Sequence, residues 1–291
     1  MYALIVNILV TTLLFTVFKL FPRFGVRSKE AIIINYLFAA GFAWWAAGPF
    51  DAMEKLGSTA TIGAAMVGLA FYYIFNKMSQ CTVKHGMGVA SISAKLSMVI
   101  PVLVFMLLDA EDKPTTLKIA AVVLAIPAVV LASAPAKSSK FGWNDLRLPG
   151  IVFLGSGLID VGFGWFSGPE FMANDSDRYL FVAIPFTIAL VIGLGQACFQ
   201  KRLSQLAHGR TWIGGAVLGI VNVGTLYWLL QAFATVPLDR SAVMPLNNLG
   251  IVLASALMGA LFFSERTTWK NIGGLGLGAV SIGLLLWPLL N

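Results

Sequence analysis

Two ionisable residues interrupt long apolar stretches of this sequence, and their types suit the binding of a charged or zwitterionic molecule. Lys95 lies in SISAKLSMVIP, residues 91–101, and Asp160 lies in GLIDVGFGW. An ammonium binds a carboxylate or phosphate, a carboxylate binds an amine, and the two together would bridge a zwitterion such as an amino acid. A charge at the centre of a membrane helix costs roughly 2.5–3.5 kcal/mol, so each of these residues needs a reason to be there.

Each of the two charges has an alternative reading. The four-carbon stem of Lys95 is long enough to carry its ammonium to the lipid headgroups, which is the snorkelling expected of lysines near helix ends. Asp160 lies near the middle of its apolar segment and has no such stem. For Asp160 the alternatives are a buried structural hydrogen bond, pairing with Lys95, binding of a substrate amine, or uptake of a proton as the coupling ion.

Uncharged polar and aromatic side chains inside the apolar segments complete the predicted substrate site. Rings with polar tips and a few amides suit a cavity that holds a small polar molecule. For each of them singly, interhelical hydrogen bonding or core packing is the alternative. Asn248 corresponds to Lys95 in the internal repeat described below, Asn247 adjoins it, and both are expected to line the site. The other predicted site residues are Tyr72, Asn76, Ser91, Asn222, Tyr227, Trp228 and Asn7.

The sequence contains none of the motifs that would indicate an enzyme or an ATP-driven pump. HExxH, GxSxG and GxxxxGK[ST] are absent. The two histidines, His85 and His208, both lie near connections. We therefore predict no catalytic residue, no metal site and no cofactor.

The composition is that of an integral membrane protein. Hydrophobic residues make up 58% and charged residues 11% of the chain, and the mean hydropathy is +0.84. A soluble domain carries about 25% charged residues. The net charge of +7 comes from basic residues at the ends of apolar runs, which indicates membrane topology and not nucleic-acid binding. The expected location is the cell inner membrane, with membrane lipids and a small-molecule substrate as partners, as a monomer or homodimer.

Apolar runs long enough to cross a bilayer, about 20 residues each, predict an all-α protein of ten transmembrane helices. Their connections are short, and they hold most of the charged residues. The ten segments are 2–20, 31–49, 60–80, 87–108, 116–135, 149–168, 179–199, 212–234, 241–263 and 270–289.

An internal repeat relates the two halves of the chain. GVASISAKL (88–96) matches SAVMPLNNL (241–249) at an offset of 153 residues, which places Asn248 opposite Lys95. DKPTTLK (112–118) matches ERTTWK (265–270) after a one-residue insertion. We predict two five-helix copies, residues 1–140 and 145–291. An odd number of spans inverts the second copy, as in many secondary transporters that bind substrate at the repeat interface.

The sequence resembles the EamA-like family of the drug/metabolite transporter superfamily. The resemblance rests on ten spans in two halves and on AKLSMVIPVLVFMLLDAEDKPT and PLNNLGIVLASALMGALFFSERTTWKNIGG, where a small-residue helix precedes an acidic turn. DAEDKP is longer than the usual turn, and no glycine opens the segment after it. The resemblance implies a central cavity, carriage of small polar metabolites, and a lysine in the fourth span that meets anionic substrates, which is the place of Lys95.

The expected function is therefore secondary active transport by alternating access, with an amino acid or organic anion as substrate. A passive channel and a membrane-embedded lipid-handling protein are the alternatives. Eleven Lys and Arg residues lie in connections that follow odd-numbered segments and four in connections that follow even-numbered ones. This excess predicts that both termini face away from the cytoplasm, whereas the resemblance implies cytoplasmic termini.

Overall fold

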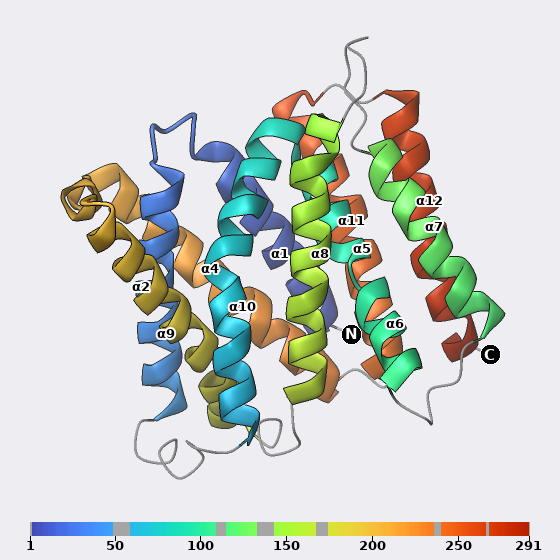
Figure 1. The fold of residues 1–291 in the computed structure, drawn as a ribbon, viewed down its shortest axis with the longest axis horizontal. Helices are drawn as coiled ribbons and strands as arrows, with labels where there is room; N and C mark the ends of the chain where they lie inside the picture. The colour runs from blue at the N-terminus through green and yellow to red at the C-terminus, as the bar shows by residue number, and fades with distance from the viewer. Residues whose placement is uncertain are drawn as a thin grey trace.

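A computed structural model describes residues 2–48, 59–108, 115–132, 143–166, 174–235, 240–265 and 268–290, which are almost entirely helical (Figure 1). No β-strand occurs in those ranges, so the predicted all-α class is confirmed. The helices are α1 (Tyr2–Leu20), α2 (Ser28–Ala47), α4 (Thr59–His85), α5 (Met87–Leu96), α6 (Val99–Leu108), α7 (Thr116–Ala132), α8 (Trp143–Phe166), α9 (Asp175–Phe199), the 3-10 helix η3 (Leu203–Ala207), α10 (Gly209–Thr235), α11 (Arg240–Phe263) and α12 (Trp269–Leu290).

These helices follow the apolar segments expected from the sequence, apart from residues 49, 133–135, 167 and 168, which lie outside the described ranges. Six helical stretches in the described part are long and apolar enough to cross a membrane. This finding supports the general part of the prediction, namely that the chain is a helical membrane protein. The six stretches are Tyr2–Leu20, Ser28–Ala47, Met87–Val104, Trp143–Phe163, Asp175–Phe199 and Gly209–Ala232.

The fourth segment is not one continuous helix, as its apolar run from 87 to 108 suggested, but is interrupted between α5 and α6. Pro101 explains the interruption: it has no N–H to donate, and its ring clashes with the carbonyl of the residue four positions earlier, Ser97. The chain makes a tighter turn there. The Ile100 N–H donates to the Ser97 carbonyl at 2.8 Å, and the Met98 N–H donates to the Lys95 carbonyl at 3.4 Å.

Close helix pairs hold the bundle together. α2 packs against α9 and α10, α4 against α8 and α9, α1 against α10 and α11, and α5 against α11 and α8. α7 and α12 lie side by side at the right of Figure 1. The α10–α2 contact depends on Gly219, because a Cβ there would lie 2.7 Å from the Asn35 carbonyl oxygen. Without water to drive association, such small residues allow helices in membranes to approach closely.

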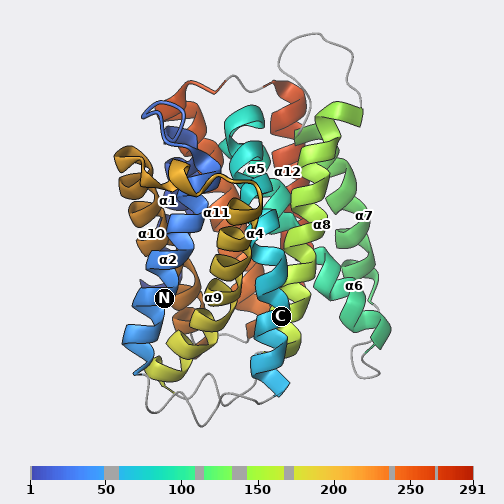
Figure 2. The same cartoon turned by 60° about the vertical axis from the view of Figure 1, so that its left-hand side comes forward.

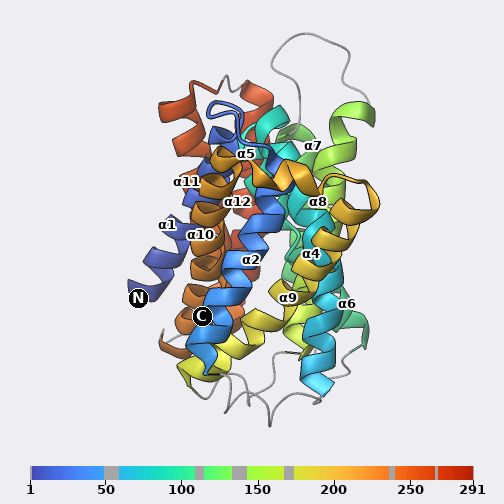
Figure 3. The same cartoon turned by 90° about the vertical axis from the view of Figure 1, so that its left-hand side faces the viewer.

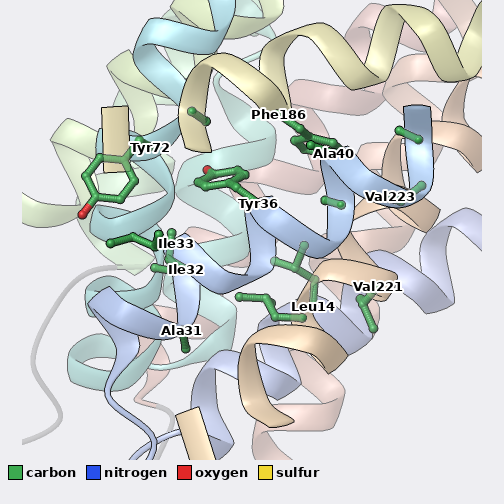
Figure 4. Close-up of a cluster of buried hydrophobic side chains, with 14 of the residues drawn as sticks. Leu14, Ala31, Ile32, Ile33, Tyr36, Ala40, Tyr72, Phe186, Val221 and Val223 are labelled. Atoms are coloured by element: carbon green, nitrogen blue, oxygen red, sulfur yellow. The ribbon is translucent and has the colours of Figure 1, made fainter. Parts of the chain in front are cut away.

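An aromatic cluster fills the space between α2, α4 and α9. The ring of Tyr36 is fully buried, with ring centroids 5.8 Å from Phe75, 6.0 Å from Phe186 and 6.5 Å from Tyr72 (Figure 4). A separate cluster on the other side of the molecule joins α5, α7, α11 and α12 and includes Ile92, Leu96 and Ile282. Apolar packing therefore fixes the helices on both sides of the polar residues described below.

Successive long helices run in alternating directions. The last residues of α1, α4, α9 and α11 therefore lie at the same end of the molecule as the first residues of α2, α5, α10 and α12, the upper end in Figure 1 and in the turned views of Figures 2 and 3. We call this the basic end, because its helix ends and connections include Arg23, Arg27, Lys29, Lys84, Lys201, Arg202, Arg210 and Lys270.

Candidate functional site

The interruption of the α5–α6 segment brings Lys95, Ser97 and Asp160 together. The Ser97 hydroxyl lies 3.2 Å from the Asp160 carboxylate and 2.6 Å from the Ala94 carbonyl oxygen. A hydroxyl has one proton, so it donates to one of these acceptors at a time. Lys95 lies two residues before Ser97 in the chain, and its side chain does not form a direct ion pair with Asp160. A cation and an anion are thus held near each other without neutralising contact.

Both charged side chains belong to the interior face of their helices. In the middle of α8 Leu154 and Leu158 are 60% and 66% exposed, and the helical period places Asp160 on the opposite side from them. On α5 the neighbours Ala94 and Leu96 are buried. Lys95 and Asp160 nonetheless remain partly accessible. This combination is expected of groups that line an internal space.

Asn248, the residue that aligns with Lys95 in the repeat, lies beside Lys95 and bonds to its backbone. The Asn248 side-chain amide donates to the Lys95 carbonyl oxygen at 3.3 Å and lies 3.3 Å from the Met98 sulfur. In an unbroken helix the Lys95 carbonyl would accept from the N–H of Val99. Asn248 replaces that donor, so its amide stabilises the break that shapes the site.

Asn247 pairs with Asn7 across the α1–α11 contact. The Asn7 amide donates to the Asn247 side-chain oxygen at 3.0 Å, and the Thr11 hydroxyl lies 3.4 Å from the Asn7 oxygen. Both asparagines are 1% exposed. The same offset of 153 residues relates Asn7 to Asp160 in the sequence. Asn7 and Asn247 thus tie α1 to α11 by a buried, uncharged hydrogen bond.

The remaining predicted site residues make other contacts. Ser91 and Asn76 bond within their own helices, to the carbonyls of Gly88 at 3.1 Å and Tyr72 at 2.8 Å. Asn222 donates to Asn35 at 3.1 Å and ties α10 to α2.

Tyr227 and Trp228 lie towards the C-terminal end of α10, away from the basic end. Tyr227 stacks on Tyr179 with ring centroids 4.7 Å apart, and Trp228 packs edge-on against Tyr2 at 6.0 Å. Tyr72, in the aromatic cluster, is 4% exposed. The structure thus gathers Lys95, Asp160, Asn248 and Ser97 at one place and distributes the other predicted residues over separate contacts.

Two ion pairs at the basic end were not predicted from the sequence, in which three of their four members lie outside the apolar segments. The Lys19 ammonium lies 2.6 Å from the Glu265 carboxylate, and the Arg202 guanidinium lies 2.5 Å from the Glu30 carboxylate. Each pair joins residues from different halves of the chain. Lys19, a second lysine within an apolar segment, was the signal that could have revealed the first pair.

Comparison with known proteins gives the fold and no activity. No family model matches the chain. An uncharacterized protein of Haemophilus influenzae is 25% identical over 280 residues, 93% of this chain and 92% of the relative. A protein of known crystal structure shares 14% sequence identity and aligns with a TM-score of 0.62 over 99% of this chain and 97% of its own. At this identity the similarity establishes that the two proteins share a fold along nearly their whole length.

Proposed function

We propose that this protein is a secondary active transporter that moves a small polar metabolite, an amino acid or organic anion, by alternating access. The observation that carries the proposal is the contact of the interrupted α5–α6 segment with α8. It holds an ammonium and a carboxylate near each other in the interior of an apolar helical protein. Interrupted helices that leave backbone groups beside a polar site are typical of transporter binding sites.

The proposed architecture is that of the EamA-like transporters, with ten crossings in two inverted repeats. The packing pairs support this arrangement. In the proposed repeat, α1 corresponds to α8, α2 to α9, α4 to α10, α5 to α11 and α7 to α12. If each helix is replaced by its counterpart, the pair α1–α10 becomes α8–α4, α2–α10 becomes α9–α4, and α1–α11 becomes α8–α5. All six of these pairs are observed. The pairs α2–α9, α5–α11 and α7–α12 exchange onto themselves. A two-fold relation of this kind is what two inverted copies produce.

The chemistry proposed for the site follows from its groups. The Lys95 ammonium binds a carboxylate or phosphate oxygen, and the Asp160 carboxylate binds an ammonium group or takes up the coupling proton. Ser97 orients Asp160 through its hydrogen bond. Because Lys95 and Asp160 do not satisfy each other directly, a zwitterion that bridges them would gain two charge-assisted hydrogen bonds, which are about twice as strong as neutral ones.

A flux measurement tests the proposal. Purified protein in liposomes is expected to show saturable uptake or exchange of an amino acid or organic acid, chosen from a panel by thermal stabilisation of the folded protein. Lys95→Ala and Asp160→Asn should each reduce the flux at least tenfold. The matched controls are Lys77→Ala, whose ammonium lies 5.2 Å from the exposed ring of Tyr73, and Asp145→Asn in the first turn of α8. The controls should retain wild-type flux.

Three outcomes would overturn the proposal. Flux that rises linearly with concentration would indicate a channel, and movement of labelled lipid between leaflets without solute flux would indicate a lipid-handling protein. Equal loss of flux and of folded protein in Lys95→Ala and Asp160→Asn would assign both residues a structural role only.

A further inference from the structure

Glu265, just after α11, lies in a cradle formed by two glycines. Its N–H donates to the Gly259 carbonyl at 3.1 Å, and the preceding Ser264 has a positive φ of 49°. The chain thereby turns the Glu265 side chain back towards the bundle. A Cβ on Gly86 or Gly259 would lie 2.6 Å or 2.5 Å from a Glu265 carboxylate oxygen. The carboxylate occupies space that exists because both positions are glycine.

In this cradle Glu265 makes contacts with two elements of the other half of the chain. Both of its carboxylate oxygens lie 3.0 Å from the Met87 N–H, the first residue of α5. One oxygen lies 2.6 Å from the Lys19 ammonium of α1, which also donates to the Thr82 carbonyl of α4 at 3.4 Å. A helix N-terminus carries about half a positive charge and is stabilised by a carboxylate. Glu265 therefore both pairs with Lys19 and caps the helix that carries Lys95.

We infer that Glu265 is a positioning residue for Lys95 and a latch that closes the basic end between the two halves. The inference rests on the proposed alternating-access function. Opening of this end requires the second half, which carries Glu265, to move away from α1 and α5. The contacts of Glu265 then break together, because one carboxylate makes them all. Release of the α5 N-terminus from its cap lets α5, and with it Lys95, shift relative to Asp160.

The Glu30–Arg202 pair provides a comparison at the same end of the molecule. It also joins the two halves, and Glu30 is 5% exposed. Among the described residues, no hydrogen bond or ion pair joins Glu30 or Arg202 to α5. Glu30 lies in the first turn of α2, so its charge stabilises that helix and not α5. Exchange of Lys19 and Glu265 keeps their ion pair and places an ammonium at the α5 N-terminus.

A native cysteine reports on this closure without any substrate. Cys81 is 0% exposed and packs in the same apolar cluster as Met87, one residue before Thr82. Cys198 is exposed and would also be alkylated, so all variants carry Cys198→Ser. The protein with Cys198→Ser alone is the parent. The measurement is the rate at which N-ethylmaleimide alkylates Cys81.

Glu265→Gln is expected to raise that rate on the order of tenfold, the loss of one or two charge-assisted hydrogen bonds. Lys19→Gln, which leaves the cap in place, should raise it less. The exchange Lys19→Glu with Glu265→Lys should not restore the parent rate. Glu30→Gln, which weakens the other ion pair at the basic end and leaves the α5 cap in place, should also raise the rate less than Glu265→Gln does.

A reporter elsewhere separates opening of the basic end from loss of folding. Ala183 lies in α9 and is 0% exposed. An Ala183→Cys reporter is introduced into a Cys81→Ala, Cys198→Ser protein, so that it is the cysteine that N-ethylmaleimide labels. This cysteine should stay protected from alkylation when Glu265→Gln is added. An unchanged Cys81 rate in Glu265→Gln, restoration by the Lys19–Glu265 exchange, or equal labelling of position 183 would each overturn the inference. Increased Cys81 labelling with no saturable flux of any solute would leave the latch in place and refute the transport proposal.

Discussion

The side-chain amide of Asn248 is expected to matter for stability only as long as the α5–α6 segment is broken. Asn248→Ala removes the donor to the Lys95 carbonyl, which is otherwise served by the longer 3.4 Å contact from Met98 N. Leaving a buried carbonyl poorly satisfied costs about 1–3 kcal/mol in proteins generally, and interhelical hydrogen bonds in membranes contribute at most about 1.7 kcal/mol. We therefore expect a loss of about 1–2 kcal/mol, or about 2–6 °C in Tm for a chain of this size.

Pro101→Ala provides the decisive background for this prediction. Alanine restores an N–H for the Ser97 carbonyl and removes the ring that excludes it, so the helix can continue through this region and the N–H of Val99 can reach the Lys95 carbonyl. In the Pro101→Ala protein, Asn248→Ala should lower the free energy of unfolding by less than about 0.5 kcal/mol beyond the packing that is lost when the side chain is shortened.

The assay is thermal unfolding of the purified protein in detergent for the two single variants and the double variant. Asn222→Ala is the matched control, because Asn222 donates to the Asn35 side chain and not to the break. Its cost should be the same with Pro101 or Ala at position 101. If the losses from Asn248→Ala and Pro101→Ala simply add, Asn248 does not serve the interrupted backbone and the account of the break is wrong.

Two further predictions concern packing and orientation. Gly219→Ala should destabilise the protein by about 1–3 kcal/mol, because the alanine Cβ would lie 2.7 Å from the Asn35 carbonyl oxygen. The control Gly41→Ala, whose Cβ would have no atom within 4 Å, should be neutral or stabilising. Equal effects of the two substitutions in thermal unfolding would show that the close approach of α10 to α2 does not depend on Gly219. Alkaline phosphatase is active only outside the cytoplasm, and it should be active when fused after Asn291. The basic end is expected to be cytoplasmic, and α12 ends at the opposite end of the molecule (Figure 1). An inactive fusion would show that the orientation is the reverse.

The sequence by itself determined the helical segments and two of the polar positions. Long apolar runs with charges at their ends become helices because unpaired backbone groups are too costly in lipid. Lys95 and Asp160 stood out for the same reason, since a charge within such a run is conspicuous. The repeat placed Asn248 opposite Lys95, and the structure has them in contact.

The tertiary structure alone decided the partners of these residues. Pro101 prevents a continuous helix, but the break at Ser97 is stable because Asn248, 150 residues from Met98 in the chain, donates to the Lys95 carbonyl that the break leaves free. Asn7 meets Asn247, and Lys19 meets Glu265, only after α1 has packed against the second half. Hydropathy reports whether a position prefers the interior, which is a local property, whereas the choice of partner depends on which helices lie side by side.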